Sequence, residues 1–140
     1  MAFEYRKGER KIVKCLLDST SAAIVVGDAI TIADATAGYF KEVDGAAEAV
    51  TGIATSASDS PAADGDLFVM VDISTLSMYQ APPDTGSVTQ AIAGRSADCG
   101  ADARSVDING STTDDIIIAE ADVDGNTVLV RLAPTFTGVV

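Results

Sequence analysis

Short apolar runs separated by turn-forming pairs, about ten residues apart, are the feature that most restricts how this chain can fold. The pairs include Gly27-Asp28, Asp44-Gly45, Asp64-Gly65 and Asn109-Gly110. The runs between them have the length of strands, and several alternate between apolar and polar residues. Regular turns of this kind are typical of an antiparallel sandwich or barrel.

The acidic residues also favour strands and turns over helices. Asp outnumbers Glu sixteen to five. Asp competes with the hydrogen bonds of a helical backbone and is favoured in turns, whereas Glu is a good helix former. No stretch shows the period of an amphipathic helix. The chain is therefore predicted to be all-β, an antiparallel β-sandwich or β-barrel-like domain of about ten short strands.

The expected strands follow from these runs. They cover residues 11–17, 22–26, 29–33, 38–43, 49–54, 67–73, 87–93, 105–108, 116–121 and 127–132. The run 67–73, LFVMVDI, is nearly continuous and is expected to be buried on both faces. Asn109-Gly110 suits a type I′ turn and predicts a hairpin there. Gly52 indicates a bulge or a close approach of another backbone.

Basic residues are concentrated at one end of an acidic chain. Five of the nine basic residues and only two acidic ones lie in the first fourteen positions, giving +3 there and −15 over the remainder. Such a split is information about partners rather than about fold. We divide the chain into a basic N-terminal arm, residues 1–14, and a single β domain, residues 15–140. The arm is expected to be extended, or disordered until it binds.

The arm contains residues suited to docking on an acidic protein surface. The candidates for this contact are Phe3, Tyr5, Arg6, Lys7, Arg10, Lys11 and Lys14. The cations supply complementary charge and the aromatic side chains supply anchors. Two alternatives are that the terminal charges only aid solubility, or that the arm binds nucleic acid. A body with a charge of −15 repels phosphates and lacks aromatic residues interleaved with basic ones, which argues against nucleic acid.

The sequence lacks the residues on which most catalytic and metal sites depend. It has no His, the commonest general base and metal ligand, and no glycine-rich phosphate-binding motif. We therefore expect no enzymatic activity, no cofactor and no metal. Asp107, Asp114 and Asp115 could supply paired carboxylates, but solvated turn and edge-strand residues are the simpler interpretation.

One segment resembles the start of a calcium-binding loop. Asp122, Asp124 and Asn126 have the right spacing, but the twelfth position, where Glu is required, is Ala133. The flanking runs 116–121 and 127–132 read as strands. A hairpin with a five-residue loop is therefore the preferred interpretation.

The cysteines and the remaining arginines allow more than one role. Cys15 and Cys99 have no CxxC spacing, so they are either two buried free thiols or one disulfide. Arg95, Arg104 and Arg131 either pair with neighbouring Asp residues or bridge a subunit interface.

Neither a membrane segment nor a secretory signal is expected. No run reaches about 18 consecutive apolar residues, and the charged N-terminus lacks the apolar stretch of a signal peptide. The chain is therefore expected to be made and used in a cytosol-like compartment.

Three stretches between Ala22 and Pro134 share a sequence pattern of turns, small residues and Val-rich strands. They read VVGDAITIADATAGYFKEVDGAAEAVTGIATSASDSPAADGDLFVMV, GRSADCG and STTDDIIIAEADVDGNTVLVRLAP. This pattern resembles the sequences of the small head decoration, or cement, proteins of tailed bacteriophages. The resemblance implies an all-β virion protein, usually trimeric, that stabilises an icosahedral capsid from outside by bridging major capsid protein subunits.

The implied partners are the major capsid protein and further copies of the chain, with neither nucleic acid nor membrane. The implied location is the capsid exterior, after synthesis in the host cytoplasm. The alternative is a β-sandwich binding module for a carbohydrate or host-surface ligand. Such sites usually expose aromatic residues, whereas this chain has three Tyr, four Phe and no Trp.

Overall fold

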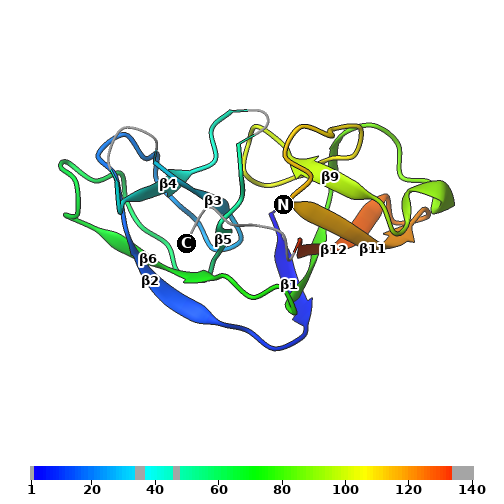
Figure 1. The fold of residues 1–140 in the computed structure, drawn as a ribbon, viewed down its shortest axis with the longest axis horizontal. Coiled ribbons are helices and arrows are strands. Elements are labelled where there is room, and N and C mark those ends of the chain that lie inside the picture. Colours follow the sequence, from blue (N-terminus) through cyan, green and yellow to red (C-terminus); the bar gives the residue numbers. More distant parts are fainter. Residues whose placement is uncertain (1, 34–36, 46–47, 134–140) are drawn as a thin grey trace.

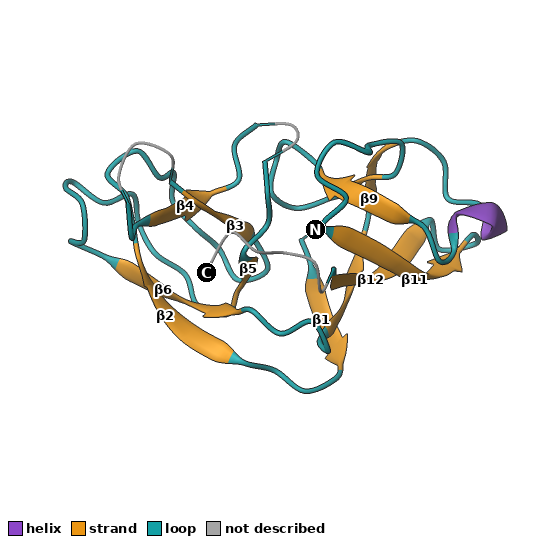
Figure 2. Cartoon of the chain, in the orientation of Figure 1, coloured by secondary structure: helices purple, strands orange, loops and turns teal. Residues whose placement is uncertain are grey.

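The structure, a computed structural model, describes residues 2–33, 37–45 and 48–133. The end of the expected domain, residues 134–140, lies outside this part. The described chain is all-β, as predicted, with twelve strands and one 3-10 helix, η1 (Figure 2). The elements are β1 (Glu4–Lys7), β2 (Ile12–Leu16), β3 (Ala29–Ile32), β4 (Phe40–Glu42), β5 (Gly52–Ala54), β6 (Phe68–Asp72), β7 (Met78–Ala81), β8 (Pro83–Thr85), η1 (Gln90–Ile92), β9 (Ser96–Cys99), β10 (Val106–Asp107), β11 (Ile116–Asp122) and β12 (Thr127–Leu132).

The strands form two sheets that lie side by side (Figure 1). The larger has the order β1-β7-β12-β11-β9-β10-β8, and the smaller has the order β2-β6-β5-β3-β4. Neighbouring strands are antiparallel except for β10 with β8. The chain crosses between the sheets twice, from β1 of the larger sheet to β2 of the smaller one and from β6 back to β7.

The smaller sheet curls until its two outer strands meet at one end. Leu17, just after β2, forms a parallel bridge with Phe40 of β4. The N–H of Asp18 also donates to the carbonyl oxygen of Phe40 over 2.8 Å. The enclosed core consists of Cys15, Leu17, Ile24, Ile30, Ala54, Val69 and Val71. This contact closes the smaller sheet at that end, whereas the two sheets of the whole domain are consistent with the expected β-sandwich.

A second, larger core joins the two sheets. Ala29 of β3 and Ile53 of β5 contribute to it from the smaller sheet, and Ile118 of β11 and Val128 of β12 from the larger one. Small side chains allow the backbones to come close. A Cβ on Gly52 would lie 2.5 Å from the carbonyl oxygen of Asp72, which confirms the predicted close approach.

The N-terminal residues are part of the sheets, which differs from the expected separate arm. β1 pairs with β7, and β2 pairs with β6 along its whole length. Phe3 is only 4% exposed, belongs to the larger core, and donates its N–H to Gly27. Phe3 explains the difference, because burial of its apolar side chain in the larger core stabilises the packing of the N-terminal residues against the domain.

Three other expectations about strands were wrong. Residues 22–26 contribute only an isolated bridge between Ile24 and Ser58, and the 87–93 run contains η1. The hairpin at Asn109-Gly110 does not form, because β10 pairs with the preceding β9 instead. The buried Asp98 carboxylate accepts hydrogen bonds from three successive backbone N–H groups, at residues 112–114, and so holds the following segment in a loop.

The buried position of Phe3 predicts that the N-terminal strand contributes to stability. Phe3→Ala is expected to lower the free energy of unfolding by about 3 to 5 kcal/mol, because it leaves a cavity in the larger core. Leu76→Ala is the control, since Leu76 is 63% exposed and its truncation should cost no more than about 0.5 kcal/mol. Urea denaturation measures both, and equal small losses would contradict the assignment of Phe3 to the core.

Candidate binding surface

A buried carboxylate fixes the position of the basic N-terminal segment. Asp72, at the end of β6, is 1% exposed. It accepts hydrogen bonds from the N–H groups of Lys11 and Ser74, each over 3.0 Å, and from the hydroxyl of Tyr79 over 2.6 Å. The Arg10 Nε lies 3.6 Å from the same carboxylate. Asp72 thus joins the start of β2 to β6 and, through Tyr79, to β7 of the other sheet.

The surroundings of Asp72 keep it charged. Burial acts to raise the pKa of Asp72, but hydrogen bonds from the Ser77 and Tyr79 hydroxyls and from two backbone N–H groups hold it below its ordinary value. Burial, together with the bond to Asp72, raises the pKa of Tyr79. The charged carboxylate therefore has enough donors to remain stable inside the protein.

Several of the predicted contact residues are used inside the protein. The Arg10 guanidinium lies 3.9 Å from the centre of the Tyr5 ring, and this ring makes an edge contact with Tyr79 at 5.7 Å. Arg6 donates to the side-chain oxygen of Gln80 and pairs with Glu4 at 3.5 Å. With Phe3 in the core, these contacts give Tyr5, Arg6 and Arg10 structural roles as well as exposed surface.

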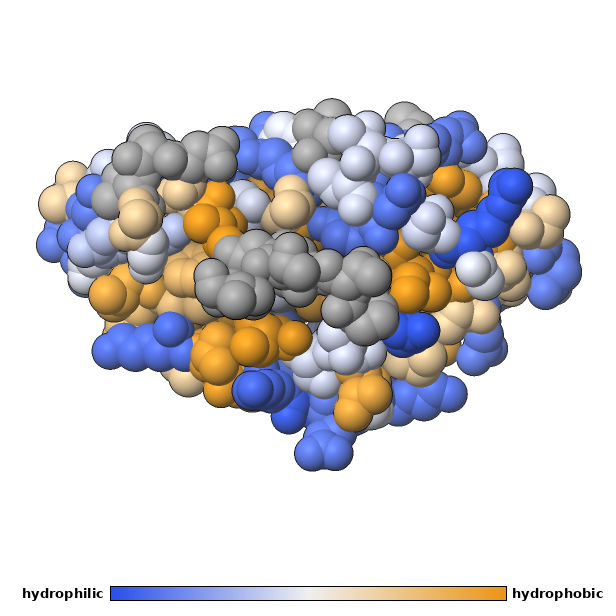
Figure 3. Space-filling model, in the orientation of Figure 1, coloured by the Kyte–Doolittle hydropathy of each residue, from blue (hydrophilic) through white to orange (hydrophobic). Residues whose placement is uncertain are grey.

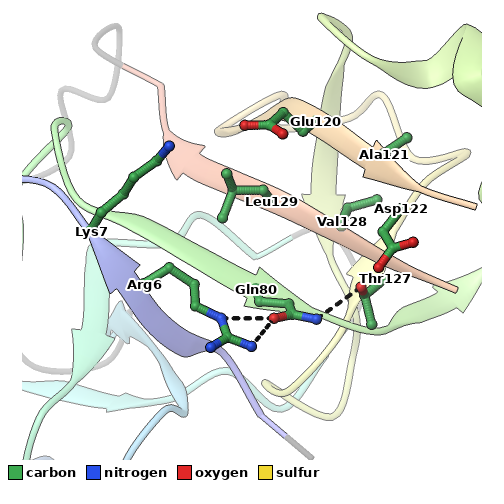
Figure 4. A pocket seen from close by; sticks show the side chains of 9 residues that line it. All are labelled: Arg6, Lys7, Gln80, Glu120, Ala121, Asp122, Thr127, Val128 and Leu129. Carbon is green, nitrogen blue, oxygen red and sulfur yellow. Dashed lines mark hydrogen bonds between the residues drawn. The ribbon is translucent and has the colours of Figure 1, made fainter. Parts of the chain in front are cut away.

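Arg6 and Gln80 also line a shallow depression of about 340 Å³ on the larger sheet (Figure 4). Gln80 donates onward to the Thr127 hydroxyl over 3.0 Å. Glu120 and Asp122 line the same depression, so positive and negative groups both border it. Its mixed charge favours no particular ligand.

The side chains of the remaining three lysines among these candidates have no charged or hydrogen-bonding partner in the described residues. Lys7, Lys11 and Lys14 are all exposed. Lys14 lies 4.4 Å from the centre of the Phe68 ring, and the other two make no ion pair within the described chain. These lysines are therefore the cations most available to an acidic partner.

Apolar side chains surround Lys14 on the outer face of β2 and β6. Ile12 is 41% exposed, Leu16 38% and Phe68 47%, and Met70 is half-buried beside them. We call the five residues Ile12, Lys14, Leu16, Phe68 and Met70 the β2 surface. Figure 3 shows hydrophobic side chains gathered over β2 and β6, along the lower left of the molecule.

Most of the β2 surface was missed from the sequence. The run 67–73 was expected to be buried on both faces, and this was wrong, because Phe68 and Met70 face outward. The signal that could have found the surface is the alternation in residues 12–16. Ile12, Lys14 and Leu16 share one face, and a lysine between two apolar residues on one face of a strand indicates contact with solvent.

Arg104 forms ion pairs that join the two sheets, and its partners are distant from it in sequence. Its Nε lies 2.7 Å from the buried carboxylate of Asp28, and its Nη2 lies 3.8 Å from Glu42. Asp28 precedes β3 in the smaller sheet, whereas Arg104 precedes β10 in the larger one. Arg95 is exposed and Arg131 half-buried, and neither makes an ion pair with a described residue.

The same cluster contains a carboxyl group that is difficult to ionise. Burial, followed by the neighbouring carboxylate of Asp28, raises the pKa of Glu42 to about 8, although Arg104 acts in the opposite direction. One Glu42 oxygen is buried and accepts no hydrogen bond from a described group. Glu42 therefore favours its neutral form in the folded protein.

The other candidates have structural positions. Cys15 and Cys99 are both free and buried, and burial raises the pKa of both thiols. The hairpin of β11 and β12 is confirmed, with a four-residue loop, 123–126, in which the Gly125 N–H donates to Asp122. Asp115 accepts a hydrogen bond from the Val50 N–H.

The described residues contain no group of three or more His, Cys, Asp or Glu side chains arranged to hold a metal ion. No helix in the described part has the length and apolar character needed to cross a membrane. Comparison of the chain with protein-family models, with curated proteins and with solved structures finds no match.

The Tyr79 hydroxyl is predicted to stabilise the Asp72 junction. Tyr79→Phe is expected to lower the free energy of unfolding by about 1 to 3 kcal/mol, because it removes a donor from a buried charge. Tyr39→Phe, which alters a more exposed tyrosine, is the matched control. Urea denaturation at neutral pH measures both, and a Tyr79→Phe loss no larger than that of the control would contradict the role of Asp72.

Glu42 predicts a specific pH dependence of stability. Its folded pKa of about 8 exceeds the ordinary 4.5, so the folded state holds a proton that the unfolded state has lost. The stability of the wild type relative to Glu42→Gln should therefore fall as pH rises from 4.5 to about 8, then level off. Denaturation at a series of pH values measures this difference, and a constant difference would show that Glu42 ionises normally.

Proposed function

We propose that this protein is a structural component of a bacteriophage virion that binds the outside of an icosahedral capsid. In this role it stabilises the shell by bridging major capsid protein subunits, as a homotrimer. The observation that supports the proposal best is the position of Lys14 among exposed apolar residues on β2, with Lys11 immediately before this strand, in an otherwise acidic domain. The resemblance of the sequence to decoration proteins supports the same role.

The β2 surface has the composition of a protein-binding site. Exposed apolar side chains provide the area that drives association, and Lys14 within that area and Lys11 just before β2 add positive charge. A partner with acidic and apolar residues would complement both properties. The lysines need not break an existing ion pair in order to bind, which keeps the cost of association low.

The acidic remainder suits a protein that covers the exterior of a particle. A charge of −15 outside the first fourteen residues keeps the outer surface solvated and discourages particles from associating. It also disfavours binding to nucleic acid.

Trimerisation would strengthen attachment by multivalency. Three copies that bind three symmetric capsid sites act together, so weak contacts at each site suffice for stable attachment. Arg95 and Arg131 are the candidates for contacts between copies, because neither pairs with a described residue. Arg104 is a weaker candidate, since Asp28 already binds it.

Neutralising the three available lysines tests the role of the surface. Lys7→Gln, Lys11→Gln and Lys14→Gln together are expected to weaken binding to capsids lacking this protein by about tenfold, because three available positive charges are lost. Co-sedimentation with the capsids measures the change. The binding of the wild type should also weaken as salt is added.

The control variant changes the net charge by the same amount, −3, at another part of the surface. Ser87→Glu, Thr89→Glu and Ala101→Glu alter exposed loop residues next to strands of the larger sheet and should leave capsid binding within about twofold of the wild type. Undiminished binding by the lysine variant would contradict the proposed surface. Failure of the wild-type protein to bind capsids, with binding to glycans instead, would favour a carbohydrate-binding module.

A further inference from the structure

β2 lies at the edge of the smaller sheet, and its backbone is available along that edge. Among the described residues it pairs with β6 on one side only, until the chain reaches the bridge at Leu17. An edge strand of this kind presents unpaired N–H and C=O groups to any chain that can lie beside it.

The pairing pattern shows which residues present these groups. The Ile73 N–H donates to Lys11, and the Leu17 N–H donates to Leu67, so the odd-numbered residues of β2 face β6. In an antiparallel pair the alternate residues direct their backbone groups the other way. Ile12, Lys14 and Leu16 therefore point their N–H and C=O groups toward the open edge.

The same edge already accepts a strand where the chain continues. Asp18 is the next even-numbered residue after Leu16, and its N–H donates to Phe40 of β4 over 2.8 Å. Among the described residues, no strand pairs with this edge over Ile12–Leu16. The open stretch thus has the geometry for strand pairing and lacks a partner within the described chain.

We infer that the open edge of β2 binds an extended acidic segment of a partner protein, which joins the smaller sheet as an added strand. Backbone hydrogen bonds to Ile12, Lys14 and Leu16 would provide affinity, and the side chains of the β2 surface would provide specificity. This inference rests on the proposed function only in placing the segment on the capsid protein.

Side chains on the outer face define the chemistry of the segment. Lys14 lies between Ile12 and Leu16 on one face of β2, and all three are exposed. Cross-strand neighbours of opposite charge attract, and apolar neighbours pack together. The preferred segment therefore carries Asp or Glu opposite Lys14 and apolar residues two positions before and after it.

Lys14 also disfavours a second copy of the chain as the occupant. If two β2 strands paired about a two-fold axis at the centre of the strand, Lys14 would face Lys14 of the other copy, and like charges directly opposite are destabilising. Edge lysines prevent self-association in this way. An acidic segment removes the repulsion and replaces it with attraction.

A synthetic peptide provides a direct test with the full chain. The peptide acetyl-Ser-Val-Thr-Glu-Thr-Val-Ser-amide has the preferred pattern, and replacing its Glu by Lys gives a charge-reversed peptide. NMR titration should show that the Glu peptide shifts the backbone amides of Ile12, Lys14 and Leu16, with a Kd on the order of 1 mM. Absence of these shifts at several millimolar peptide would overturn the inference.

Reversing the charge of Lys14 should reverse the preference. Lys14→Glu is expected to weaken binding of the Glu peptide by about fivefold and to strengthen binding of the Lys peptide to a similar extent. Ser87→Glu with Ala101→Glu changes the net charge by the same amount in loops of the larger sheet and should not reverse the preference. A parallel change in both peptides, or equal effects of the two variants, would reject pairing at Lys14.

N-methylated peptides test the added strand without altering the protein. In an antiparallel strand, the N–H of the peptide Glu faces β2, whereas the N–H of the next Thr faces away. Methylating the Glu nitrogen should abolish binding, and methylating the Thr nitrogen should not. Equal tolerance of both methyl groups would show that the peptide does not pair as a strand.

Hydrogen exchange on capsids separates this inference from the proposed function. In bound protein, the amides of Ile12, Lys14 and Leu16 should exchange at least tenfold more slowly than in free protein. Capsid binding with no protection of these amides would overturn strand addition but leave the capsid role intact. Peptide binding without capsid binding would do the reverse.

Discussion

The buried carboxylate of Asp72 is the interaction on which the arrangement of both sheets depends. It ends β6, binds the backbone at the start of β2 and accepts the Tyr79 hydroxyl of β7. A charge inside a protein is tolerated only when donors surround it, so the segments that supply those donors are held together. The position of the N-terminal strands, and with it the β2 surface, follows from this requirement.

A second polar cluster, formed by residues distant in sequence from Asp72, also joins the two sheets. Arg104 binds the buried Asp28 from the other sheet, and Glu42 lies against both. Between these polar links, the shared core contains many Ala and Val residues. Small side chains let the backbones approach closely, as at Gly52. The hydrogen-bonded carboxylates then determine how the two sheets are oriented.

The sequence predicted the fold class because alternation and turn pairs are local properties. The strands over 29–33 and 67–73 and the hairpin of β11 and β12 follow from such patterns. Which strand pairs with which depends on contacts distant in sequence, so the incorporation of β1 could not be predicted. The hairpin predicted at Asn109-Gly110 does not form for the same reason, since the Asp98 carboxylate accepts hydrogen bonds from the backbone of the segment that follows.

The candidate site was predicted in part. Charge counting identified the basic segment, but only the structure separates the three available lysines from Arg6 and Arg10, which have partners inside the protein. The closure of the smaller sheet at Leu17 adds a further property. Because β4 occupies the edge beyond that point, an incoming strand can extend only a short way before it is blocked. The paired stretch is thereby limited to a few residues, and short edges of this kind reduce the tendency of a domain to aggregate through its own strands.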